Sequence, residues 1–137
     1  CQPRKYYRVS CALEMDSRPL EKEEVEAVEK RDNYLVPGLP LKRSVIVDIS
    51  GGGIRFVGNY AYEPESLICC KYNLATDGRV KEYTLVAKIL TVRELEDRPG
   101  IYEHRAQYIN IDTADREEII RFIFEEERKY RKREKGL

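Results

Sequence analysis

Residues 44–57 read SVIVDISGGGIRFV, and this stretch predicts a β-hairpin near the centre of the chain. Its first strand places Val45, Val47 and Ile49 on one face, because successive side chains of a strand point to opposite sides. Its second strand, 54–57, follows a turn of one serine and three glycines. Three glycines in a turn indicate positive φ angles or a close approach of the backbone to another group. The order of strand, glycine turn and strand is typical of antiparallel β structure.

Four further segments have the pattern of short strands. Residues 6–15 alternate apolar and polar side chains with a period of two, so the first strand is predicted to begin near Tyr6. The other three strands are predicted at 66–73, 81–94 and 101–111. Turn residues rich in Asp, Pro and Gly separate these three segments. Six short strands predict an all-β domain, either an antiparallel barrel or a sandwich.

The last segment, 115–135, predicts a C-terminal helix. Asp115 and Glu118 have the spacing of a capping box at its start. The apolar stripe of this helix consists of Ile119, Phe122 and Ile123. Its final part, 128–135, has six basic residues and one acid, which suits the negative end of a helix dipole. We expect this end to be solvated, and the alternative is contact with a second helix or a partner.

The segment 16–43 interrupts the strand pattern. Residues 21–32 hold six acids and three bases, and several positions recur at helical spacing. A short exposed helix and a long charged hairpin arm fit this composition equally well. Residues 33–40, NYLVPGLP, predict a turn region, because Pro and Gly interrupt regular structure.

Length and composition limit the class of protein. With 137 residues, the chain is predicted to form one domain with a single core. It has 25 basic and 25 acidic residues, so its formal net charge is zero. A domain that grips long nucleic acid usually has a basic excess, so this class is not expected, whereas small anions are not excluded. No apolar run approaches the roughly 18 residues of a membrane span, so we expect no membrane span.

The four cysteines are Cys1, Cys11, Cys69 and Cys70, and they show no C-x-x-C spacing. We expect reduced thiols in a cytoplasmic protein, with Cys69 and Cys70 packed in the fold. Cys1 stands where an initiator Met would be, so we expect the chain to be a piece of a longer protein.

The sequence lacks the patterns of common catalytic and metal sites. The one histidine, His104, lies within a predicted strand, and no G-x-S-x-G elbow precedes a helix. One histidine and unpaired cysteines provide no zinc or iron ligand set. The glycine turn at 50–53 lacks the G-K-[ST] of a P-loop and leads into a strand. We therefore predict neither an enzyme nor a metal site.

Two groups of residues instead suit a small guanine nucleotide. Arg4 and Arg8 lie four positions apart before the first strand, and a guanidinium can bind phosphate oxygens or the O6/N7 edge of guanine. Asp48 and Ser50 are two positions apart and so share one face of a strand end, which Gly53 leaves uncovered. A carboxylate can accept hydrogen bonds from guanine N1 and N2, and a hydroxyl with open turn amides suits phosphate.

Together these residues resemble the two motifs of the PilZ domain, a bacterial receptor module for cyclic di-GMP. The motif R-x-x-x-R matches Arg4 to Arg8, and [DN]-x-S-x-x-G matches Asp48 to Gly53, in the family's order. The resemblance covers the whole chain, 1–137. It implies a six-stranded antiparallel β-barrel with a C-terminal helix, the architecture that the strand pattern also predicts.

The resemblance implies a ligand site and a switch. The ligand-binding residues would be Arg4, Arg8, Asp48, Ser50 and Gly53, with Lys5, Gly52 and Arg105 as additional contacts. The arm, residues 1–8, would wrap over cyclic di-GMP, which family members bind as a monomer or an intercalated dimer. The movement of the arm would act on an N-terminal domain before Cys1, as in the flagellar-brake members. The implied role is control of motility or biofilm-related output through the flagellar motor or another protein partner.

Two departures from the family pattern leave alternatives open. The insertion 16–43 is longer than the usual hairpin, and we expect it to be solvated rather than a partner contact. Arg105 stands where many members have a small glycine, so it would either contact the ligand or crowd the site. The rival hypothesis is a degenerate PilZ-like interaction module that binds protein and no nucleotide, and the intact motifs argue against it.

Overall fold

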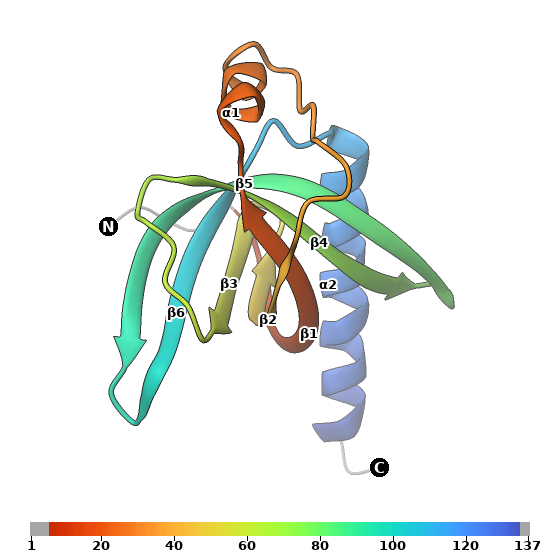
Figure 1. Cartoon of the computed structure of the whole chain (residues 1–137). Coiled ribbons are helices and arrows are strands. Elements are labelled where there is room, and N and C mark those ends of the chain that lie inside the picture. Colours follow the sequence, from red (N-terminus) through yellow and green to blue (C-terminus); the bar gives the residue numbers. More distant parts are fainter. Residues whose placement is uncertain (1–5, 135–137) are drawn as a thin grey trace.

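The computed structural model describes residues 6–134 and shows a six-stranded barrel with two helices (Figure 1). The elements are β1 (Arg8–Pro19), α1 (Lys22–Glu29), β2 (Lys42–Ser50), β3 (Gly53–Gly58), β4 (Leu67–Thr76), β5 (Arg79–Leu95), β6 (Arg98–Ile109) and α2 (Thr113–Glu134). The strands pair antiparallel in the order β1-β2-β3-β6-β5-β4, and β4 pairs with β1 to close the barrel. Closure pairs the strand edges that an open sheet would expose. The predicted antiparallel barrel with a C-terminal helix is confirmed.

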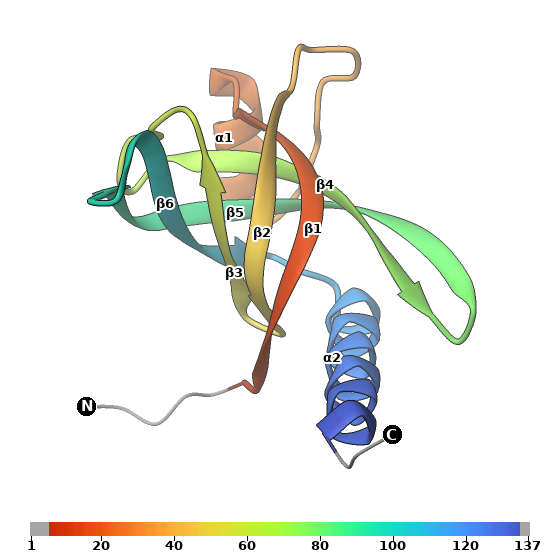
Figure 2. The ribbon, with the colours of Figure 1, turned by 90° about the horizontal axis from the view of Figure 1, so that it is seen from below.

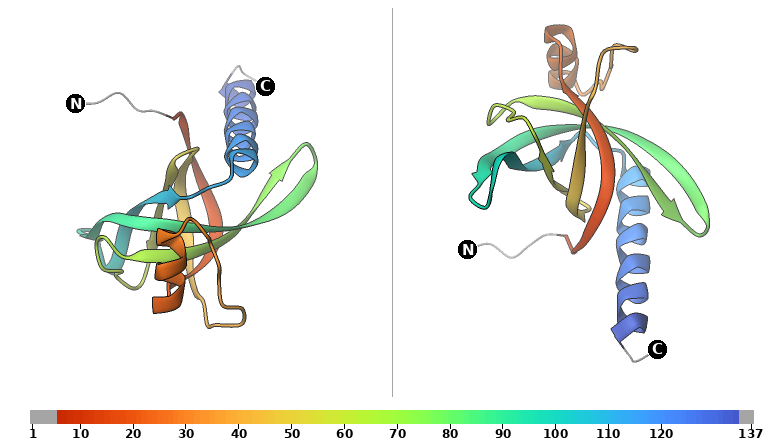
Figure 3. Two further views of the ribbon diagram at one scale, coloured as in Figure 1. Left: turned by 90° about the horizontal axis from the view of Figure 1, so that it is seen from above. Right: turned by 60° about the horizontal axis from the view of Figure 1, so that its bottom comes forward.

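The core fills the barrel and continues beneath α2. Inward-facing side chains from β1 to β6, such as Met15, Phe56 and Tyr108, are buried together. The predicted apolar stripe of the last helix is buried against them, and α2 lies beside β1 (Figure 2). Each fully buried side chain of this kind contributes about 1.5–3 kcal/mol to stability. The β4–β5 hairpin extends past the barrel alongside α2 (Figure 3).

The start of α2 differs from the prediction. The helix begins at Thr113, and the backbone N–H of Arg116 donates to the Asp112 carbonyl at 3.0 Å. The Asp115 and Glu118 carboxylates instead bind Lys81 of the β4–β5 hairpin, at 3.5 and 2.6 Å. The predicted capping box of Asp115 and Glu118 was therefore wrong, because both side chains lie inside the first turns and face the hairpin.

The strand β2 does not bury the predicted face. Val45 is exposed and Val47 is half-buried, whereas Ile46 is buried together with Ile49. The pairing of β2 with β3 slips between Ile46 and Asp48, so Val47 is an extra residue in β2. A bulge of this kind shifts the alternation by one position. Ile46 and Ile49 can therefore both face the core.

The charged segment between β1 and β2 contains the short helix α1. The Arg18 side chain of β1 donates to Glu24 of α1 through two nitrogens at 2.7 and 2.6 Å. Glu24 also accepts from the backbone N–H groups of Glu21 and Val36, at 2.6 and 2.7 Å. These hydrogen bonds, with Arg18 first, lower the pKa of the buried Glu24 carboxyl to about 2. The pair attaches α1 and the loop after it to the end of the barrel opposite the glycine turn.

The cysteines Cys11, Cys69 and Cys70 are free thiols, and the last two are buried, as expected of packing residues. Burial, the largest cause, raises the pKa of the Cys11 thiol to about 12. The buried Cys70 thiol has its pKa raised for the same reason. Protonated thiols are weak nucleophiles, so the geometry indicates packing roles for both side chains. Cys1 lies outside the described residues.

Candidate functional site

A pocket of about 180 Å³ lies on the barrel surface where β1, β2, β3 and β6 meet. Its lining includes six of the residues predicted for the ligand site, Arg8, Asp48, Ser50, Gly52, Gly53 and Arg105. They come from four strands, β1, β2, β3 and β6, and from the turn between β2 and β3. The structure therefore brings the described residues of both motifs to one place. Arg4 and Lys5, also predicted to bind the ligand, lie outside the described residues.

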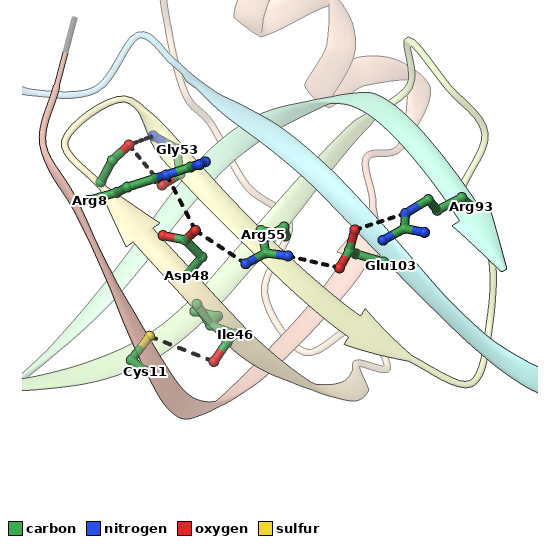
Figure 4. Close-up of polar contacts among 9 residues, drawn as sticks. Arg8, Cys11, Ile46, Asp48, Gly53, Arg55, Arg93 and Glu103 are labelled. Carbon is green, nitrogen blue, oxygen red and sulfur yellow. Dashed lines mark hydrogen bonds and ion pairs between the residues drawn. The ribbon is translucent and has the colours of Figure 1, made fainter. Parts of the chain in front are cut away.

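Asp48 is the buried acid of this pocket, with 7% of its surface exposed. Its Oδ2 atom lies 3.5 Å from Arg8 Nε and 3.3 Å from Arg55 Nη2 (Figure 4). Its Oδ1 atom is buried and has no hydrogen-bond partner within the described part of the chain. A buried carboxylate oxygen without a donor is costly, and it marks a place where a ligand donor would be stabilised.

Arg55 is a site residue that the sequence analysis missed. It pairs with Asp48 across the β2–β3 hairpin, and its second Nη atom binds Glu103 of β6 at 3.0 Å. Glu103 in turn accepts from Arg93 Nε at 3.1 Å, so side chains of alternating charge extend from the pocket along the barrel surface (Figure 4). The hairpin register could have identified Arg55, because a residue directly opposite Asp48 on the next strand shares its face.

Three arginines and one aspartate line the pocket, so its charge favours an anion. Arg8, Arg55 and Arg105 supply the positive charge, and Asp48 lies between the first two. Arg55 and Arg105 are register partners on β3 and β6. Like charges opposite each other across a sheet repel, and a bound anion would relieve that repulsion. Arg105 is exposed at the pocket edge.

Ser50 closes its own turn, which corrects the prediction of open turn amides. The N–H groups of Gly52 and Gly53 donate to Ser50 Oγ at 3.1 and 3.2 Å. The Ser50 hydroxyl in turn donates a long hydrogen bond to the Gly53 carbonyl, with 3.4 Å between the two oxygens. This arrangement is a serine turn, in which the hydroxyl replaces a backbone acceptor. The Ser50 hydroxyl would have to give up this long bond to the Gly53 carbonyl before it could donate to a ligand.

Gly53 is required by a close approach of the backbone. A Cβ atom at this position would lie 2.0 Å from the Ala106 carbonyl oxygen of β6. Gly51, Gly52 and Gly53 are absent from the glycines with positive φ, which are Gly38, Gly78 and Gly100. Of the two explanations that the sequence left open for this turn, the structure therefore supports close approach.

Two tyrosines at the base of the arm lie outside the barrel core. Tyr6 and Tyr7 precede β1, and Tyr7 is 62% exposed, with its ring centroid 6.3 Å from that of Phe124 in α2. The Tyr6 ring lies against the glycine turn: a Cβ added at Gly52 would be only 3.0 Å from it. The first strand begins at Arg8 rather than near Tyr6.

His104 lies in the core, away from the pocket. It is fully buried, its ring stacks on Phe56 with centroids 4.5 Å apart, and its Nε2 accepts from the Tyr62 N–H at 3.1 Å. Burial lowers the pKa of this imidazole. In the described residues, no group of His, Cys, Asp and Glu could hold a metal ion. Neither helix of that part is long and apolar enough to cross a membrane.

Comparison with known proteins identifies a domain family and several solved structures that are similar to this chain. The family model of the PilZ domain matches residues 2–125. The PilZ domain of YcgR from Escherichia coli, solved with c-di-GMP, has a TM-score of 0.66 at 15% identity, and the match covers 99% of this chain and 100% of that chain. A crystal structure of YcgR from Escherichia coli in complex with c-di-GMP has a TM-score of 0.62 at 16% identity, and the match covers 98% of this chain and 50% of that chain.

The inhibitor of motility MotI/DgrA from Bacillus subtilis also has this fold, with a TM-score of 0.71 at 15% identity. The match covers 93% of this chain and 52% of that one, so the chain spans about half the length of MotI/DgrA and of the longer YcgR structure. No curated protein sequence matches the chain significantly. At such identities the solved structures establish the fold alone.

Proposed function

This chain belongs to the PilZ domain family, and from that premise we propose that it is a receptor domain for cyclic di-GMP that catalyses no reaction itself. One observation carries the proposal. The described residues of the two motifs line one positively charged pocket, and the buried Asp48 offers it an oxygen without a donor among residues 6–134. The c-di-GMP complexes of YcgR, which share the fold, support the same ligand.

The pocket chemistry suits both parts of the nucleotide. The Asp48 carboxylate would accept from N1 and N2 of a guanine, whose edge presents two donors, with the unpaired Oδ1 taking one of them. The guanidinium of Arg8, with its side chain 31% exposed, would leave Asp48 to bind a phosphate or the guanine O6/N7 edge. Arg55 would stay on Asp48 and keep the buried carboxylate paired during that exchange. The Ser50 hydroxyl would turn from the Gly53 carbonyl and donate to a phosphate oxygen.

The pocket needs the arm to hold a whole dinucleotide. Its volume of about 180 Å³ is smaller than the ~300–1,000 Å³ usual for small-molecule sites. We propose that the described residues form the floor and that Arg4 and Lys5 complete the site from above. Arg8 already pairs with Asp48, so ligand binding would exchange one partner of Arg8 for another and order the arm over the ligand.

The output of the receptor would be control of motility or of biofilm formation. The similarity in fold to an inhibitor of motility supports the first of these. The arm would transmit ligand binding to an N-terminal domain, and a component of the flagellar motor or another protein would be the partner. The free thiols suit the reducing cytoplasm as the location.

The test compares two arginine variants in calorimetric titration with cyclic di-GMP. Arg8→Ala removes one of the two guanidinium groups next to Asp48, and we expect binding to weaken by about 10- to 150-fold, the usual loss for a hydrogen bond to a charged group. The matched control is Arg43→Ala, because Arg43 is an exposed arginine that pairs with Glu14 and Asp16, outside the pocket lining. Equal affinity of the two variants would contradict the assigned site. Failure of the unaltered chain to bind would instead favour the protein-interaction module.

A further inference from the structure

Two peptide groups in the turn between β2 and β3 direct their N–H groups at Ser50. These are the N–H groups of Gly52 and Gly53, which donate to Ser50 Oγ at 3.1 and 3.2 Å. In a trans peptide, the carbonyl oxygen points opposite to the N–H of the same peptide plane. A hydrogen bond to the Gly51 carbonyl therefore fixes the direction of the Gly52 N–H. In the same way, a hydrogen bond to the Gly52 carbonyl fixes the direction of the Gly53 N–H.

Each of these two carbonyls accepts a hydrogen bond from another element. The Gly52 carbonyl accepts from the backbone N–H of Tyr108 in β6 at 2.9 Å, so the barrel itself fixes that peptide. The Gly51 carbonyl accepts from Nε of Arg116, in the first turn of α2, at 3.1 Å. The Gly51–Gly52 peptide thus depends on a side chain for its orientation. Glycine backbone rotates with little steric resistance, so without the Arg116 hydrogen bond the Gly51–Gly52 peptide could turn away from Ser50.

Arg116 also contacts the base of the arm. Its guanidinium carbon lies 5.1 Å from the centre of the Tyr6 ring. A Cβ at Gly51 would lie 2.9 Å from Ile120 Cγ1 of α2 and 3.2 Å from Tyr6 Cδ1. The turn, the arm and α2 therefore meet without space for another methyl group, and Arg116 contacts both the turn and the arm.

We infer that Arg116 is a positioning residue for the nucleotide site: it fixes the Gly51–Gly52 peptide that orients the Ser50 hydroxyl and fixes the base of the arm that carries Arg8. The inference rests on the proposed function. Arg116 is absent from the pocket lining, so it acts through Ser50 and Tyr6 rather than on the ligand. The same contacts couple the occupied site to α2, since a change in the turn moves a hydrogen-bond partner of that helix.

The experiment measures both the turn and the affinity in Arg116→Ala. In the ligand-free chain, we expect the Gly52 amide to exchange with solvent faster than in the unaltered chain, while the Gly53 amide, fixed through Tyr108, keeps its protection. In titration with cyclic di-GMP, we expect Kd to rise about tenfold, the size of one hydrogen bond or cation–π contact. Arg116→Lys keeps the positive charge and an N–H donor group without the planar guanidinium, so it should recover part of the affinity.

The control is Arg121→Ala on the same helix, whose side chain is 64% exposed and lies 3.9 Å from Asp77. It should leave both readouts unchanged. Thermal unfolding of each variant shows whether the fold is retained at the titration temperature. If the unaltered chain binds and Arg116→Ala binds equally well, or if Gly52 exchange does not change, the inference is wrong while the proposed function stands. If the unaltered chain does not bind, the proposed function fails and the inference fails with it.

Discussion

Replacing Gly53 by Ala should destabilise the barrel strongly, because the added methyl group meets backbone rather than a side chain. The new Cβ would lie 2.0 Å from the Ala106 carbonyl oxygen and 3.0 Å from the Gln107 Cα. The strands β3 and β6 would have to separate by roughly 1.4 Å to reach an ordinary contact. Overpacking of this kind costs about 1–3 kcal/mol, and each weakened ladder hydrogen bond adds about 1 kcal/mol. We expect a loss of about 3–4 kcal/mol.

Urea unfolding followed by circular dichroism measures this loss, and Gly58→Ala at the other end of β3 is the matched control. A Cβ at Gly58 would approach the ring of the half-buried Tyr60 to 3.1 Å, and a side chain can shift by a few tenths of an ångström more easily than a paired backbone. The control should change the free energy of unfolding by less than about 1 kcal/mol. Equal effects of the two substitutions would refute the argument that close approach of β6 requires the glycine of the second motif.

Two further predictions concern buried ionisable groups. Glu24→Gln leaves the Arg18 charge without its partner and should lower the free energy of unfolding by about 3–5 kcal/mol, whereas the exposed Glu23→Gln should change it by less than about 0.5 kcal/mol. Equal values in urea unfolding would contradict the pairing. The pKa of His104 is lowered by burial from 6.5, so protons favour the unfolded chain and stability should fall as the pH drops below about 6.5, by at most about 1.4 kcal/mol per pH unit. In urea unfolding at pH 7.5 and 5.5, the free energy of unfolding of His104→Gln should no longer depend on pH in this way. If the variant keeps the pH dependence of the unaltered chain, another group causes it.

The barrel could be predicted from the sequence because strand and turn signals are local. The alternation in 6–15, the glycine turn and the final apolar stripe each depend on neighbouring residues, and each marks a real element. The face of β2 could not be predicted in this way. The bulge at Val47 depends on how β2 pairs with β3, and one extra residue reverses the apparent alternation.

The residues that line the pocket could be predicted only in part, and their contacts could not be predicted. The motif spacing identified Asp48 and Ser50, since their chemistry is carried by the side chains themselves. The hydrogen bonds that the Gly52 and Gly51 carbonyls accept come from Tyr108 of β6 and Arg116 of α2, distant elements that meet the turn only in the folded chain. The Arg18–Glu24 pair was missed for the same reason, because burial and not residue type makes it important.

The central claim is that this barrel binds cyclic di-GMP, and calorimetric titration of the unaltered chain tests it most directly. The account predicts saturable binding of cyclic di-GMP and none of comparable strength for GMP or cyclic di-AMP. Ligand at 100 times Kd should also raise the free energy of unfolding by about 2.7 kcal/mol. Absence of heat and of any thermal shift with cyclic di-GMP, or equal binding of cyclic di-AMP, would contradict the account.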